Sequence, residues 1–149
     1  MTEKKPFLRF EWNNSFSIGI SVIDDQHRGF VEQANALAAT IERMDQEALG
    51  NTIQYLTGFV INHFAAEELF MIRTRYPGFK EHRDEHSRIV KNVFDVYDRL
   101  WTRPMTREEA NELLDAIDWW IQHHIREVDR EVEAHVRATS AERTRTDQP

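Results

Sequence analysis

The sequence predicts an all-α protein, an antiparallel up-down-up-down four-helix bundle with an extended N-terminal arm. Three observations favour this fold. Apolar residues recur at alternating spacings of three and four in four separate stretches, which is the repeat of one helix face. The 149 residues include only five glycines and four prolines, few for a loop-rich chain. Short polar turns separate the four stretches, so consecutive helices should lie antiparallel. A chain of this length suits one domain with one core.

The arm should cover residues 1–21, an apolar but irregular stretch broken by asparagines and a glycine. Ser21 followed by Asp24 predicts an N-cap with its acidic third position, so a first helix should cover 22–44. A second helix should cover 48–74 and stop before a Tyr-Pro-Gly breaker.

The third helix should run from 79 to 101. Thr106 and Glu109 predict a capping box that opens the fourth helix, which we expect to end near residue 138. The bundle domain would then be 22–138. Residues 139–149 are polar and lack periodicity, which predicts a flexible C-terminal tail.

Each predicted helix carries a histidine where its apolar stripe calls for a hydrophobic residue. Burying so many ionisable groups without partners would cost several kcal/mol each, so they must pair with one another or bind something. A metal centre accounts for them most simply. The inward-facing donors are His27, His63, Glu67, His82, His86 and His124.

The donor types constrain the metal. Cysteine is absent, which excludes disulfides, iron–sulfur clusters and thiolate ligation. Six nitrogen and oxygen donors already fill one octahedral ion, and helices packed about 8–10 Å apart can hold two ions between them. Iron or manganese suits such sites. Asp129 follows His124 by five residues, about 140° around an ideal helix, so the pattern alone does not make it a ligand.

Charge and hydropathy exclude several other functions. The net charge of −7 and the interleaved basic residues argue against nucleic-acid binding. No apolar run is long enough to span a membrane and no signal peptide is evident, so we expect a cytoplasmic protein that does not bind membranes. Nothing marks an interface between copies, and we expect a monomer.

An ordered set of motifs spans residues 12–129. It begins with Trp12, Gly19 and Asp24-x-Gln26-His27. The remaining motifs, in order, are His63-Phe64-x-x-Glu67-Glu68-x-x-Met71, Tyr76-Pro77, His82-x-x-x-His86 and Trp120-x-x-x-His124-Ile125-x-x-x-Asp129. Together they resemble the signature of the bacterial hemerythrin family.

The resemblance implies a non-haem di-iron site that binds O2. It implies that His82, His86 and His124 ligate one iron and that His27 and His63 ligate the other. Glu67, Asp129 and an oxo or hydroxo group would bridge the two, which leaves one free position for O2 on the two-histidine iron. Matching positions imply a dry O2 pocket lined by Phe30, Phe64, Trp120, Ile121 and Ile125.

The leading functional hypothesis is reversible O2 binding for transport, storage or delivery to an oxygen-consuming partner enzyme, without catalysis. One alternative is an O2 or redox sensor that acts through a separate partner protein. Another is a di-iron oxidase or peroxidase, but such bundles use Glu-x-x-His pairs and none occurs here.

Overall fold

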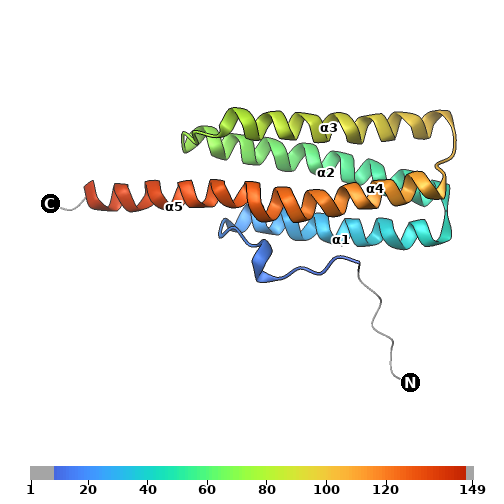
Figure 1. Cartoon of the computed structure of the whole chain (residues 1–149), viewed down its shortest axis with the longest axis horizontal. Helices are drawn as coiled ribbons and strands as arrows, with labels where there is room; N and C mark the ends of the chain where they lie inside the picture. The colour runs from blue at the N-terminus through green and yellow to red at the C-terminus, as the bar shows by residue number, and fades with distance from the viewer. Residues whose placement is uncertain (1–8, 147–149) are drawn as a thin grey trace, which may run out of the picture.

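The computed structural model describes residues 9–146, so the first eight residues of the expected arm and the last three of the expected tail lie outside the described residues. The helical segments form four long rods, which lie side by side and alternate in direction (Figure 1). The predicted antiparallel four-helix bundle is confirmed. The first three rods are α1 (Ser21–Arg43), α2 (Gln46–Arg73) and α3 (Phe79–Thr102).

The fourth rod is built from three consecutive segments. They are α4 (Arg107–Trp120), the π-helical segment η2 (Ile121–Val128) and α5 (Asp129–Thr146). The backbone stays helical through both junctions, so the rod is continuous in Figure 1. The predicted capping box opens it: Thr106 Oγ1 accepts from the Glu109 amide at 3.2 Å, and Glu109 Oε2 accepts from the Thr106 amide at 3.0 Å.

The predicted cap of the first helix is wrong. Ser21 is the first helical residue, Ile20 occupies the cap position, and no side chain caps the helix. Asp24 instead accepts hydrogen bonds from the Ser17 hydroxyl at 2.6 Å and the Ile18 amide at 2.8 Å. The carboxylate therefore fastens the arm to the start of α1.

Residues 9–20 form the described part of the arm, with one short turn, η1 (Asn14–Phe16). The side chain of Asn35 on α1 accepts a hydrogen bond from the Phe10 amide at 2.9 Å and donates one to the Phe10 carbonyl at 2.8 Å. Phe10, Phe16 and Ile18 are buried. The arm thus adds apolar side chains to the bundle core.

The second helix begins two residues earlier than predicted. Asp45, expected in the turn, is the N-cap of α2 and accepts a hydrogen bond from the Ala48 amide at 3.1 Å. A helix start with this cap satisfies an amide that the turn would leave unpaired.

The fourth helix does not end near residue 138 as predicted, because α5 continues to Thr146. No glycine or proline interrupts residues 129–146. Glu133 and Arg137 form an ion pair one turn apart at 2.5 Å, and the Thr139 hydroxyl donates to the His135 carbonyl at 3.1 Å. A polar helix stabilised by such local pairs has no apolar periodicity to reveal it.

The α3 stripe faces the core along its length, as its periodicity predicts, but it is fully buried only in its first half. Among the residues of α3, only His82 and His86 are fully buried. The second half of the stripe remains partly buried: Ile89, Val93, Val96 and Leu100. In the described part of the chain, no helix combines the length and apolar character needed to cross a membrane.

Candidate metal centre

Seven donor side chains meet inside the bundle, and all four rods contribute to them. One comes from α1, two each from α2 and α3, one from η2 and one from the start of α5. None is more than 3% exposed. The structure therefore brings together every predicted ligand: His27, His63, Glu67, His82, His86, His124 and Asp129.

The donors fall into two groups that share Asp129. In the smaller group, His27 Nε2 lies 3.1 Å from His63 Nε2 and 3.0 Å from Asp129 Oδ2. In the larger group, Asp129 Oδ1 lies 2.9 Å from His124 Nε2 and 3.1 Å from His82 Nε2. Asp129 thus presents one carboxylate oxygen to each group.

Glu67 also lies between the groups. Its Oε2 atom is 3.1 Å from His86 Nε2, and 3.6 Å from the Nε2 atoms of both His63 and His82. Both carboxylates therefore lie close to histidines of the two groups.

The π-helical segment explains how Asp129 reaches the site. The backbone amide of Asp129 donates to the carbonyl of His124, five residues earlier, instead of to a carbonyl four residues earlier. The wider turn brings the side chains of His124 and Asp129 to the same face, whereas an ideal α-helix would place them about 140° apart. Such π turns in proteins often coincide with functional sites.

Three of the histidines are oriented by partners on their outer nitrogen. Nδ1 of His63 donates to Gln26 Oε1 at 2.7 Å. Nδ1 of His86 donates to Glu68 Oε1 at 3.0 Å, and Nδ1 of His124 donates to Glu85 Oε1 at 2.8 Å. A neutral ring that donates from Nδ1 carries a lone pair on Nε2, so these bonds aim lone pairs at the interior.

Hydrogen bonds alone do not account for the short distances between donor atoms inside the cluster. His86 Nε2 and His124 Nε2 lie 3.1 Å apart, and in the neutral rings both are lone-pair acceptors. Both oxygens of Glu67, both oxygens of Asp129 and both nitrogens of His82 are buried without a hydrogen bond, although short distances surround them. Buried acceptors in this arrangement need a cation, or protons in its place, between them.

The spacing fits metal ligation. Two ligand atoms at right angles around an ion about 2.1 Å away are themselves about 3.0 Å apart. The shortest interior distances, 2.9–3.1 Å, match that edge of an octahedron. Imidazole with carboxylate and without sulfur suits iron. The cluster is fit for a di-iron site.

Charge coupling inside the cluster shows what replaces a cation in the bare protein. Although burial alone would lower it, the carboxylates of Asp129 and Glu67 raise the pKa of His82 to about 9. Asp129 likewise overcomes burial and raises the pKa of His124 to about 10. Burial lowers the pKa of His63 to about 4, so this ring stays neutral. Burial would raise the pKa of Asp129, but the His124 charge holds it well below its ordinary value.

The predicted pocket residues all lie buried beside the cluster or in the adjoining core: Phe30, Phe64, Trp120, Ile121 and Ile125. The Phe64 ring stacks on His86 with centroids 3.8 Å apart, and Trp120 stacks on His124 at 5.4 Å. Phe30 packs edge-on against Trp120 at 4.4 Å. Aromatic rings therefore shield the donors from solvent on this side.

The helix periodicity assigned no role to Gln26 or Glu85, which bond the outer nitrogens of His63 and His124. Gln26 and Glu85 immediately precede His27 and His86. Each is turned about 100° from its neighbour and so reaches a histidine on the next helix. A polar residue directly before an inward histidine was the available signal.

Comparisons with known proteins agree with this geometry. The hemerythrin HHE cation binding domain matches residues 18–136. The bacteriohemerythrin of Stenotrophomonas maltophilia (strain R551-3) is 31% identical over 129 residues, which cover 84% of this chain and 82% of that protein. A hemerythrin of Sipunculus nudus is 28% identical over 114 residues, 77% of this chain and 86% of that one. A crystal structure of wild-type hemerythrin is similar in fold, with a TM-score of 0.73 at 24% identity over 82% of this chain and 93% of that chain.

Proposed function

The chain belongs to the hemerythrin family, and on that premise we propose that it holds two iron ions and binds O2 reversibly at them. His82, His86 and His124 would ligate one iron, and His27 and His63 the other. Glu67 and Asp129 would bridge the pair. When bound, the irons supply the electrons that O2 takes up on binding and returns on release.

The observation that carries the proposal is a pair of ring nitrogens that face each other and would both be lone-pair acceptors in the neutral rings. His86 Nε2 and His124 Nε2 lie 3.1 Å apart while Glu68 and Glu85 accept from their outer nitrogens. A site that uses two carboxylates to aim two acceptors at each other is arranged for a cation.

The protein residues would orient the ligands and keep water out. The three bonds to Nδ1 fix ring orientation and tautomer. Buried Phe64 and Trp120 stack on the rings of His86 and His124 and would limit the access of water to them. A dry surrounding favours release of O2 as the neutral gas over irreversible oxidation of the site.

Transport, storage or delivery of O2 to an oxygen-consuming partner enzyme would follow from reversible binding, with O2 as the small-molecule partner and no turnover. A cytoplasmic location stays a prediction. The absence of Glu-x-x-His pairs supports carriage over oxidase or peroxidase chemistry.

The test is an optical titration of the reduced, iron-loaded protein with O2, followed by removal of the gas. We expect a colour that forms with one O2 per chain and disappears when O2 is removed, over repeated cycles. Permanent conversion to the ferric form in the first cycle would contradict carriage and favour redox sensing. Rapid turnover of added reductants would instead favour an enzyme.

A further inference from the structure

A cavity of about 570 Å³ lies beside α3 on the far side of Trp120 from the donor cluster. Its floor comes from α2 and its two sides from α3 and α4. The partly buried half of the α3 stripe lines it: Ile89, Val93, Val96 and Leu100. The space lies within the range of natural ligand pockets, which are mostly apolar with few polar groups.

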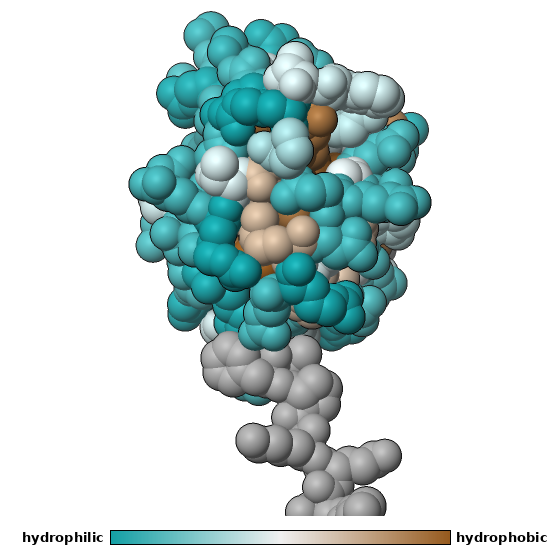
Figure 2. Space-filling model, turned by 90° about the vertical axis from the view of Figure 1, so that its right-hand side faces the viewer, coloured by the Kyte–Doolittle hydropathy of each residue, from teal (hydrophilic) through white to brown (hydrophobic). Residues whose placement is uncertain are grey.

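The cavity extends along the space between α3 and α4 to the end of the bundle where α3 is followed by α4. Figure 2 views that end, and tan and brown apolar surface shows within a ring of hydrophilic residues. Arg99, Arg103 and Met105 line this part of the cavity, whereas Phe30 and Trp120 line the opposite, inner part. The cavity thus has charged side chains at the end near the α3–α4 connection and buried aromatic side chains at its inner part, and exposed residues such as Asn92 and Trp119 border it between α3 and α4.

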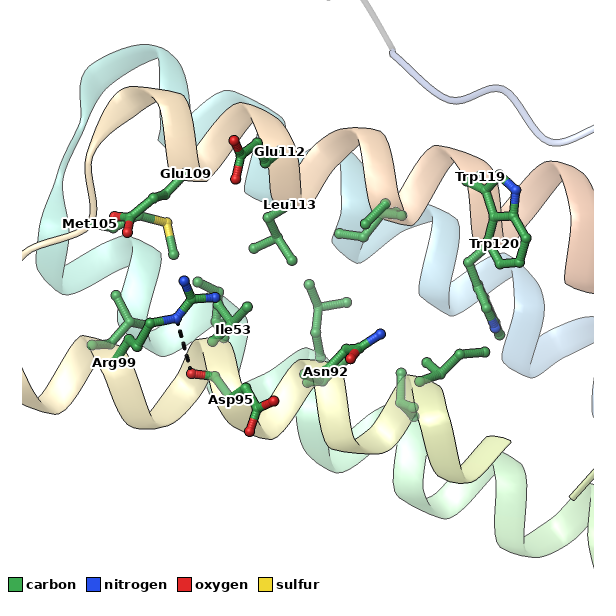
Figure 3. Close-up of a pocket in the computed structure, with 18 of the residues that line it drawn as sticks. Ile53, Asn92, Asp95, Arg99, Met105, Glu109, Glu112, Leu113, Trp119 and Trp120 are labelled. Atoms are coloured by element: carbon green, nitrogen blue, oxygen red, sulfur yellow. Dashed lines mark hydrogen bonds between the residues drawn. The ribbon is translucent and has the colours of Figure 1, made fainter. Parts of the chain in front are cut away.

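Of the two arginines that line this part of the cavity, Arg103 forms an ion pair with a carboxylate, and Arg99 forms none among the described residues. Asp95 pairs with Lys91 at 2.9 Å, and Glu109 holds Arg103 through two bonds of 2.9 and 2.5 Å. The guanidinium of Arg99 extends into the space between α3 and α4 in Figure 3, and its Nε bonds the Asp95 carbonyl at 3.3 Å. Among the residues that the structure describes, no carboxylate pairs with this guanidinium, so its Nη groups can donate hydrogen bonds to a bound anion.

The length of the cavity limits the length of a chain that it could hold. Ile89 and Arg99 are ten residues apart on α3, about 15 Å at about 1.5 Å per residue. An extended chain of about ten to twelve carbon atoms has that length. Such a chain would complete the burial of the partly buried apolar stripe, and its head would reach Arg99.

We propose that this cavity binds a free single-chain amphiphile, an alkyl carboxylate of about ten to twelve carbons, with its carboxylate on Arg99 and its tail against Phe30 and Trp120. The site lies beside the donor cluster and contains none of the seven donors, and the proposal does not depend on iron or O2. Its occupant would nevertheless contact Phe30 and Trp120, which are also two of the residues predicted to line the O2 pocket, and Trp120 stacks on His124.

Calorimetric titration of the full-length, iron-loaded protein with decanoate and with 1-decanol tests the proposal. We expect both to bind, with decanoate about tenfold tighter because of its charged hydrogen bonds. Hexanoate should bind at least tenfold more weakly than decanoate, since it buries fewer methylene groups. Failure of decanoate to bind below millimolar concentration, or equal binding of hexanoate, would overturn the proposal.

Two rim variants of opposite sign test the head group. Arg99→Gln should weaken decanoate about tenfold and leave 1-decanol unchanged. Glu112→Gln removes an exposed acidic side chain from the same rim and should strengthen decanoate about twofold. Equal effects of Arg99→Gln on the two probes would place the head elsewhere and overturn the assignment.

A cavity-filling variant tests the tail site. Val93→Trp should weaken the binding of both decanoate and 1-decanol by at least tenfold, because the indole would occupy the cavity. The matched control Val22→Trp makes the same change at a position that is 56% exposed on α1 and should leave both affinities unchanged. Undiminished binding by folded Val93→Trp protein, or binding to phospholipid vesicles in place of the free acid, would contradict this site.

Discussion

The carboxylate of Asp129 lies 2.9 Å from the ring of His124, five residues before it in the same continuous helical rod. In an ideal α-helix the two side chains would diverge by about 140°. The π-helical segment between Ile121 and Val128 removes this divergence. The same carboxylate touches both donor groups, so a local change of helix type completes the cluster.

Replacing Asp129 with asparagine should cost the site its shared ligand. We expect Asp129→Asn to lower iron content from about two per chain to below one, because an amide presents only one oxygen and no charge. Metal analysis of protein purified from iron-replete cells measures this. The control is Asp115→Asn, at an exposed position of the same rod that pairs with Arg9. Full iron content in both variants would contradict the bridging role.

The bond from His124 to Glu85 should strengthen metal binding. Loss of an outer partner of a ligand histidine typically weakens metal affinity 10–100-fold. We expect Glu85→Gln to weaken iron binding by about tenfold, measured by competition with a chelator. Glu127→Gln, which alters an exposed partner of His123, is the matched control and should match the parent protein. An unchanged affinity in Glu85→Gln would show that this bond only positions the ring.

A polar group in the predicted pocket should shorten the life of the O2 complex. Ile121 is 1% exposed, and Ile121→Asn places an amide in its apolar surroundings. We expect oxidation of the O2-bound form to speed up several-fold, because water and protons gain access to bound O2. The decay of its optical spectrum measures this. The neighbouring exposed substitution Gln122→Asn should not change the rate, and an unchanged rate in Ile121→Asn would count against the dry pocket.

Metal binding should release protons. In the bare protein, and against the effect of burial, the carboxylates raise the pKa of His82 to about 9 and that of His124 to about 10. Below these values both rings hold an extra proton that a metal must displace. Affinity for iron should therefore rise as the pH increases from 7 to 9 and level off above about 10. Calorimetry in buffers of different ionisation enthalpy should give about two protons released per chain at pH 7. An affinity that does not change with pH would contradict this coupling.

The capping box of the fourth rod should contribute to stability independently of the metal. Thr106→Ala removes the acceptor of the Glu109 amide and should lower the free energy of unfolding by about 1 kcal/mol. Urea unfolding of the metal-free chain measures the difference. Thr102→Ala alters another exposed hydroxyl, at the end of α3, and should change stability by less than about 0.5 kcal/mol. Equal effects of the two substitutions would remove the special role of the cap.

Much of the fold and of the site follows from helix periodicity. The stripe repeat placed the five histidines and Glu67 on inward faces, because side chains three and four residues apart share a face. Asp129 escaped this reasoning, since periodicity assumes one helix type and the π segment breaks it. Only the family resemblance pointed to it.

The errors elsewhere have related causes. Asp24 looked like part of a cap, but the long-range bonds of the arm use its carboxylate. The end of α5 has no apolar repeat, so its helix could not be read from hydropathy. The half-buried stripe of Val93 and Val96 shows the converse limit: periodicity finds an apolar face but cannot tell whether another helix covers it.

The most direct test of the central claim is anomalous diffraction at the iron absorption edge from crystals of protein purified from iron-replete cells. We expect two iron peaks among the seven buried donors, with Asp129 ligating both. A structure in which these imidazoles and carboxylates bond only to one another and to water, with no anomalous peak, would contradict it.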